Sequence, residues 1–220
     1  MSNIRVSDHP LIASKVAKIR DIKTGSKEFR EIASEITTLL FYEATREIST
    51  AIEKVTTPNC ETECRTINAQ LAVVPILRAG LGMVNGILSL MPTTKVGHIG
   101  IFRNPETLQP VEYYSKLPSD CEKRIVFLID PMLATGGTAT SAISYLQGKG
   151  VPTCNIKFLC LIACPEGIEK LQSEYPDVDI YAAANDIYDK YPDGRDKGLN
   201  DHGYIVPGLG DAGDRIFGTK

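Results

Sequence analysis

Between residues 71 and 183 the sequence alternates short apolar runs with segments of helical periodicity, and this alternation limits the possible folds more than any other feature. We expect strands at 71–77, 95–102, 111–117, 124–129, 156–164 and 178–183, and helices at 79–91, 137–149 and 165–175. Several of the runs are apolar at nearly every position, as in strands whose two faces are both covered. The pattern therefore predicts the α/β class, with a parallel twisted sheet flanked by helices.

Two further helices are expected ahead of this region, at 7–22 and 27–54, because apolar residues recur there at helical spacing. Asp8 is the expected N-cap of the first helix, and Pro10 fits its first turn. Residues 55–69 are rich in β-branched side chains and could form a short peripheral strand or hairpin. The chain should thus place N-terminal helices and a hairpin before the sheet.

Length and charge narrow the classes of function. A chain of 220 residues fits one domain, since single cores hold about 100 to 250 residues. Its 27 acidic and 24 basic residues give a net charge of −3, which argues against a surface that neutralises a nucleic-acid backbone. No run approaches the roughly 20 apolar residues of a membrane span, and the first residues lack the pattern of a secretory signal. We expect a cytoplasmic protein with no nucleic-acid and no membrane partner, in which a local basic pocket could still bind a small anion.

Cysteine and histidine positions show no metal-site pattern. Cys60 and Cys64 are four residues apart, as are Cys160 and Cys164, which is not the C-x-x-C spacing of a zinc site. We therefore expect the six cysteines to be buried, reduced thiols. The histidines share no ligand spacing either, and we interpret all three as structural: His9, His98 and His202.

The strongest chemical signal follows the apolar run 124–129. Asp130 stands where that strand ends, and Gly136 and Gly137, flanked by threonines, stand where the next helix begins. Glycines allow backbone N–H groups to approach an anion, and a helix N-terminus adds a positive dipole end. The segment predicts a phosphate cradle, although for T-G-G-T alone a plain strand-to-helix turn remains an alternative.

The run 129–138 resembles the phosphoribosyl diphosphate (PRPP) loop of type I phosphoribosyltransferases. Other segments resemble the uracil branch of that family, namely 8–11, 74–80, 95–100, 110–114, 116–120, 200–215 and 217–220. The likeness covers nearly the whole chain. It implies a single phosphoribosyltransferase domain over residues 1–220, with a C-terminal loop region that binds the base.

The resemblance implies transfer of a 5-phosphoribosyl group from PRPP to N1 of uracil, giving UMP and pyrophosphate with Mg²⁺ required. It also implies a homodimer or homotetramer, and GTP as an effector in some members. Two other readings stay open. One is a related regulator that binds RNA and senses nucleotides, and the other is an enzyme for another base.

Residue roles follow from the same resemblance. The residues assigned to PRPP are Arg78, Arg103, Asp130, Pro131, Met132, Leu133, Ala134, Thr135, Gly136, Gly137, Thr138 and Asp211. Among these, Arg78 and Arg103 would hold the diphosphate, because guanidinium groups match phosphate oxygens. Asp130 would accept hydrogen bonds from the ribose hydroxyls. These three and Asp211 are the expected catalytic residues. Pro131 stands where many type I relatives carry a second acid, so a two-carboxylate ribose clamp is not expected.

The glycine-rich stretch 204–215 reads as a loop rather than a helix. Its exposed backbone groups could pair with the carbonyls and N3–H of uracil, and cytosine would leave some of them unpaired. The residues assigned to uracil are Tyr204, Ile205, Gly210, Asp211 and Ala212. Asp211 is also assigned to Mg²⁺, most of whose ligands would come from the substrate.

Two segments complete the expected organisation. Residues 102–112 hold two prolines and no regular pattern, and they resemble the mobile hood that closes over the substrates in this family; a surface hairpin is the alternative. Residues 185–198 form an insertion relative to the usual bacterial enzymes, expected to be a solvated surface segment. Its alternative is contact with a neighbouring subunit or with the site entrance.

Overall fold

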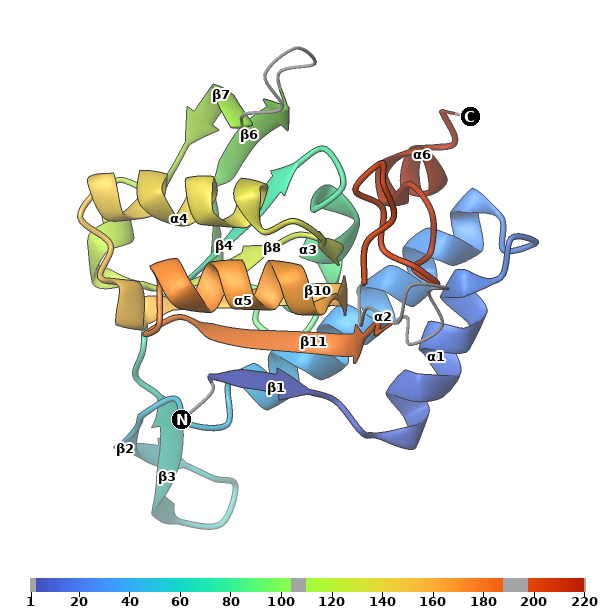
Figure 1. Cartoon of the computed structure of the whole chain (residues 1–220). Helices are drawn as coiled ribbons and strands as arrows, with labels where there is room; N and C mark the ends of the chain where they lie inside the picture. The colour runs from blue at the N-terminus through green and yellow to red at the C-terminus, as the bar shows by residue number, and fades with distance from the viewer. Residues whose placement is uncertain (1–2, 104–109, 188–197, 220) are drawn as a thin grey trace.

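The computed structural model describes residues 3–103, 110–187 and 198–219. A central twisted sheet lies between two layers of helices (Figure 1). Its strands in spatial order are β1 (Ile4–Val6), β11 (Asp179–Asn185), β10 (Ile156–Ala163), β8 (Ile125–Ile129), β4 (Leu71–Leu77), β6 (His98–Arg103) and β7 (Pro110–Lys116). Two short strands join them, β5 (Lys95–Val96) beside β4 and β9 (Met132–Leu133) beside β10. The predicted α/β class is confirmed.

Five of the six pairings along this order are parallel, and β7 alone runs antiparallel to its neighbour β6. The predicted parallel sheet is thus confirmed for these five pairings, and β6 and β7 add one antiparallel pair at its edge. A parallel strand needs a crossover of a dozen or more residues, whereas only residues 104–109 separate β6 from β7. That connection suits two antiparallel strands.

Alternate side chains of the strands enter two separate cores. Along β8, Phe127 and Ile129 face one core, and Val126 and Leu128 face the other. The first core is closed by α1 (Pro10–Arg20), α2 (Ser26–Ala44), α3 (Leu81–Leu88) and α6 (Ala212–Phe217), and the second by α4 (Gly137–Gly148) and α5 (Pro165–Glu174). Burial on both faces explains the continuous apolar runs of the sequence.

The structure corrects three N-terminal expectations. The helix predicted over 27–54 ends at Ala44, because the next residues are rich in β-branched side chains and form the hairpin of β2 (Thr50–Thr56) and β3 (Glu61–Ile67). The hairpin predicted within 55–69 therefore begins earlier. The N-cap of α1 is His9 instead of Asp8, and the His9 imidazole accepts the Leu11 N–H at 3.1 Å.

The cysteines also depart from expectation. All six are free, but Cys60, Cys64 and Cys154 are exposed, while Cys121, Cys160 and Cys164 are buried. Cys60 and Cys64 lie in the turn and in β3 of the protruding β2–β3 hairpin (Figure 1), and Cys154 lies in a short 3-10 helix at Thr153–Asn155. Burial was thus correctly predicted for three thiols and wrong for the other three.

Candidate functional site

The sheet topology brings residues from separate parts of the chain to one edge. Strands β4, β8, β10 and β11 are parallel neighbours, so their carboxyl ends meet there. Arg78 directly follows β4, Asp130 follows β8 and Asp186 follows β11. In open α/β sheets this edge is where ligands bind.

The glycine turn that was predicted as a phosphate cradle lies at this edge. Gly136 is the N-cap of α4 with φ of +78°, a conformation that favours glycine, and it turns the chain from β9 into the helix. A cavity of about 180 Å³ lies over the turn. Its lining residues are Asp130, Met132, Ala134, Thr135, Gly136, Thr138 and Ala139. The first N–H groups of a helix lack intrahelical acceptors, so α4 offers donors to an anion here.

Residues at the start of α5 contact the backbone of the cradle. A Cβ on Gly167 would lie 2.5 Å from the carbonyl oxygens of both Leu133 and Ala134, so only glycine allows this close approach. The Cys164 thiol donates to the Ala134 carbonyl at 3.1 Å. Burial raises the pKa of Cys164 to about 12, so this thiol stays protonated and keeps donating. The cradle backbone is therefore held by direct contacts.

A second cavity, of about 370 Å³, adjoins the first. It is lined by Ala79, Met132, Ala134, His202, Gly203, Tyr204, Ile205, Gly210, Asp211, Ala212 and Gly213. Met132 and Ala134 line both cavities, so the two spaces share a wall. All five residues predicted to contact the base lie on this second cavity.

The loop that lines the second cavity is ordered by side-chain contacts. The Asn200 side-chain oxygen accepts the N–H groups of His202 and Tyr204, each at 3.0 Å. The Glu166 carboxylate, at the start of α5, accepts the N–H of Gly198 at 3.1 Å. Elements that support the cradle thereby also anchor this loop.

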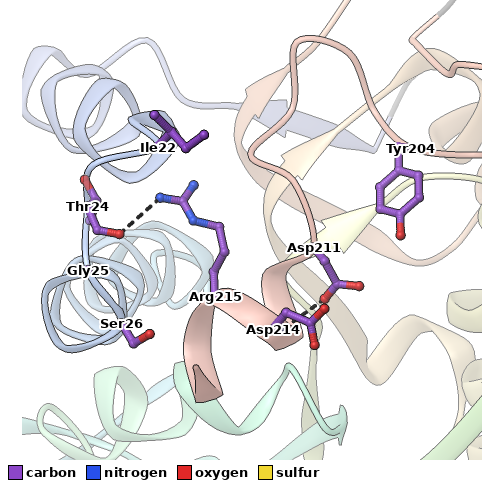
Figure 2. A pocket seen from close by; sticks show the side chains of 8 residues that line it. All are labelled: Ile22, Thr24, Gly25, Ser26, Tyr204, Asp211, Asp214 and Arg215. Atoms are coloured by element: carbon purple, nitrogen blue, oxygen red, sulfur yellow. Dashed lines mark hydrogen bonds between the residues drawn. The ribbon is translucent and has the colours of Figure 1, made fainter. Parts of the chain in front are cut away.

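Asp211 ends the loop and begins α6. Its Oδ1 accepts the Asp214 N–H at 2.9 Å, which caps the helix. The stretch 204–215 was predicted to lack helix, and α6 corrects that prediction, because this cap and burial of Ile216 stabilise a short helix despite the glycines. Asp211 and Tyr204 also line a third cavity, of about 420 Å³, that reaches the turn between α1 and α2 (Figure 2).

The carboxylates beside the two cavities fit the expectation that Mg²⁺ is bound mostly through the substrate, with Asp211 as the assigned protein ligand. Within residues 3–103, 110–187 and 198–219, no cluster of three or more His, Cys, Asp or Glu side chains could hold a metal ion. Asp130 and Asp211 face the two adjoining cavities, one each. Mg²⁺ keeps several waters and is commonly bound through one or two carboxylates plus substrate phosphates. The donor set agrees with that mode of binding.

Arg78 and Arg103, the arginines assigned to the diphosphate, do not line the cradle cavity in the described part of the structure. The Arg78 side chain is 60% exposed, lies 4.0 Å from Asp214 and stacks over the Phe217 ring at 5.8 Å. Arg78 thus lies against α6 and is not among the residues that line either adjoining cavity. Arg103 is the last residue of β6, and its side chain lies outside the described part of the structure.

Some residues assigned to PRPP line neither cavity, and one residue that lines a cavity had no assigned role. Pro131 and Leu133 are buried and line neither cavity, so only their backbones could reach a ligand. His202 was interpreted as structural, yet it lines the second cavity. Its place beside the glycine-rich stretch was the available signal. The central residues of the expected hood (104–109) and insertion (188–197) lie outside the described residues.

Comparison with solved structures first identifies the class. Adenine phosphoribosyl transferase from Trypanosoma brucei, in complex with AMP, pyrophosphate and ribose-5-phosphate, matches with a TM-score of 0.54 at 13% identity over 84% of each chain. That likeness shows a shared phosphoribosyltransferase fold. The AQ2163 protein from Aquifex aeolicus is much more similar, with a TM-score of 0.87 and 37% identity over 97% of each chain.

Sequence comparison then identifies the family. Residues 6–219 match the family model described as uracil phosphoribosyltransferase. The protein named uracil phosphoribosyltransferase from Alkaliphilus oremlandii is 53% identical over the full length of both chains. The chain therefore belongs to the uracil phosphoribosyltransferase family, and the resemblance predicted from the sequence is confirmed.

Proposed function

We propose that this protein transfers the 5-phosphoribosyl group of PRPP to N1 of uracil, giving UMP and pyrophosphate. The observation that carries the proposal is the pair of adjoining cavities. One has the donors and the acid that suit a sugar phosphate, and the other is walled by the glycine-rich loop. Because Met132 and Ala134 line both, a ribose in the first would lie next to a flat base in the second.

In this proposal the cradle residues 134–138 bind the 5′-phosphate through the N-terminus of α4. Asp130 accepts hydrogen bonds from the ribose hydroxyls and so orients the sugar. The bond between the anomeric carbon and the diphosphate oxygen breaks, and its electron pair leaves on pyrophosphate. N1 of uracil bonds to that carbon and releases its proton to water or to the departing pyrophosphate. The sugar carries positive charge as the bond breaks, so correct placement and exclusion of water accelerate the step.

Charge builds on the departing diphosphate, and arginines are suited to stabilise it. We assign this role to Arg78 and Arg103. Arg78 is bound only loosely to α6, at 4.0 Å from Asp214, so a polyanion can draw it away. Mg²⁺ would neutralise diphosphate charge, and Asp211 is the residue that would hold it on the protein side. Residues 102–112 would cover the substrates as a hood.

Base choice would come from the backbone around the second cavity. Ile205 is buried, and its peptide groups together with those of Gly210 and Ala212 border the space. Backbone donors and acceptors that match uracil leave unpaired groups against cytosine, whose N4 and N3 reverse the pattern. Tyr204 is half exposed at the rim.

The experiment is conversion of labelled uracil to UMP with PRPP, in the presence and absence of Mg²⁺. We expect UMP only with Mg²⁺, and pyrophosphate release with uracil but not with purines, orotate or cytosine in the same panel. Release with another base would favour an enzyme for that base. Absence of turnover together with a shifted RNA band in a mobility assay would favour the regulator.

Assembly, effector and location belong to the same proposal. The β2–β3 hairpin exposes apolar side chains, with Ile52 at 66%, which supports burial in a homodimer or tetramer. Sedimentation would measure the assembly, and rates with and without GTP would test an effector. Six free cysteines support a reducing compartment such as the cytoplasm. No helix among the described residues has the length and apolarity to cross a membrane.

A further inference from the structure

The C-terminal loop, residues 204–211, doubles back at Gly208. Gly208 has φ of +57°, and a Cβ there would collide with the Ile205 carbonyl oxygen. The two arms of the loop, with Ile205 on one and Gly210 on the other, continue onto the wall of the 370 Å³ cavity. The place of Gly208 therefore sets where both arms lie.

One ion pair binds both backbone polar groups of Gly208. Asp186, just after β11, is 5% exposed and accepts the Gly208 N–H on Oδ2 at 2.8 Å. Arg20, the last residue of α1, donates Nη1 to the Gly208 carbonyl at 2.6 Å. Arg20 also pairs with both oxygens of the Asp186 carboxylate. The turn is thus fixed to an ion pair between two elements that do not themselves line the cavity.

A second arginine holds the same region from the other side. Arg215 of α6 donates to the carbonyls of Leu209 at 3.0 Å, Ile19 at 2.7 Å and Asp21 at 2.6 Å. Figure 2 shows its side chain extending from α6 toward the turn between α1 and α2. Arg215 therefore connects the loop to the C-terminal end of α1, the same end from which Arg20 contacts Gly208.

We propose that Asp186 and Arg20 are positioning residues for the base, which hold the C-terminal loop in register with the cradle and thereby set both uracil affinity and discrimination against cytosine. This inference rests on the proposed function, since it takes the second cavity as the base site. Backbone groups select a base only when their places are fixed, because a displaced donor accepts a wrong partner or water. An ion pair that hydrogen-bonds to both the N–H and the carbonyl of Gly208 holds these backbone groups in place.

Asp186→Asn is the direct test. Three donors converge on the carboxylate: the Gly208 N–H and two guanidinium nitrogens of Arg20. A side-chain amide has one acceptor oxygen, so at least one donor must face an NH₂ group. Arg20→Lys is the milder variant, because an ammonium keeps the charge but loses the paired geometry.

Asp120→Asn is the matched control. The Asp120 carboxylate likewise receives several donors, two from Arg124 and one from Lys95. Arg124 also donates to a backbone carbonyl, that of Leu71, at 3.0 Å. This pair precedes β8, so it lies at the edge of the sheet opposite to the site. The control reproduces the loss of a bidentate pair without touching the C-terminal loop.

The measurement is KM for uracil and for PRPP, cytosine use and melting temperature, on the full-length variants and the wild type. We expect Asp186→Asn to raise KM for uracil about tenfold or more and to increase cytosine use, with KM for PRPP within about twofold of wild type. Arg20→Lys should show a smaller shift in the same direction, and it decides the case if Asp186→Asn does not fold.

Asp120→Asn should lower the melting temperature and leave both KM values unchanged. Equal changes in the two KM values, or none beyond those of the control, would show a purely structural pair and overturn the inference while the enzyme still makes UMP. Absence of UMP from the wild-type protein would instead overturn the proposed function and this inference with it.

Discussion

Replacing Gly137 by alanine separates anion binding from folding at the cradle. Gly137 is the first residue of α4 and lies between Gly136 and Thr138, which line the 180 Å³ cavity. A Cβ at Gly137 would meet only the Thr135 hydroxyl, at 3.8 Å, so the substitution fits the folded protein. Alanine also favours helix by up to about 1 kcal/mol over glycine. The variant should fold with unchanged or slightly higher stability.

If the cradle binds the 5′-phosphate as proposed, the same methyl group would lie beside it at the helix N-terminus. Losing one charge-assisted hydrogen bond costs about 1.5–3 kcal/mol, which corresponds to roughly 10- to 150-fold in affinity. We expect Gly137→Ala to weaken binding of ribose 5-phosphate by this factor in calorimetry and to raise KM for PRPP similarly. KM for uracil should change little, because the second cavity is not altered.

Gly148→Ala is the matched control at the other end of α4, where a Cβ meets nothing within 4 Å. It should gain the same helical preference and leave both substrates unaffected. A folded Gly137→Ala variant that binds ribose 5-phosphate as tightly as wild type would refute the assignment of the phosphate to the cradle. Melting temperatures of both variants establish that the fold is intact.

Three further changes test the site. Asp211→Asn should keep α6 stable, since asparagine caps a helix as well as aspartate does, but it should lower turnover about tenfold or more. Asp211→Ala should in addition lower the free energy of unfolding by about 1 kcal/mol. Equal rates for Asp211→Asn and the wild type would exclude a role for the charge. Gly167→Ala should cost about 1–3 kcal/mol and raise KM for PRPP, because its Cβ would lie 2.5 Å from two cradle carbonyls; an unchanged denaturation midpoint would contradict this contact. Burial raises the pKa of Cys164 from 9.0 to about 12, so a thiol reagent at pH 8 should label Cys154 and spare Cys164. The free energy of unfolding should fall between pH 9 and about 12, because the thiol loses its proton first in the unfolded chain. Early labelling of Cys164, detected by mass spectrometry, would disprove its burial.

Local sequence was sufficient where the determining contacts are local. The run from β8 through Asp130 to the diglycine predicted a strand, an acid at its end and a helix start, and each lies where it was expected. Strand-length apolar runs, glycine turns and helical spacing act over a few residues, so they are legible without a fold. The end of α2 was predicted too late because helical periodicity continues past Ala44. Only the pairing of β2 with β3 makes the following residues a strand.

The sequence by itself determined the class of fold, the glycine turn into α4 and the family, because these depend on short motifs and on the order of strands and helices. Tertiary structure alone decided that Arg78 lies against α6 and that Arg20 meets Asp186, 166 residues further along the chain. No spacing rule joins residues so distant, since only the packing of α1 beside β11 brings their side chains together. The hydrogen bonds that both residues make with Gly208 therefore exist only in the folded molecule.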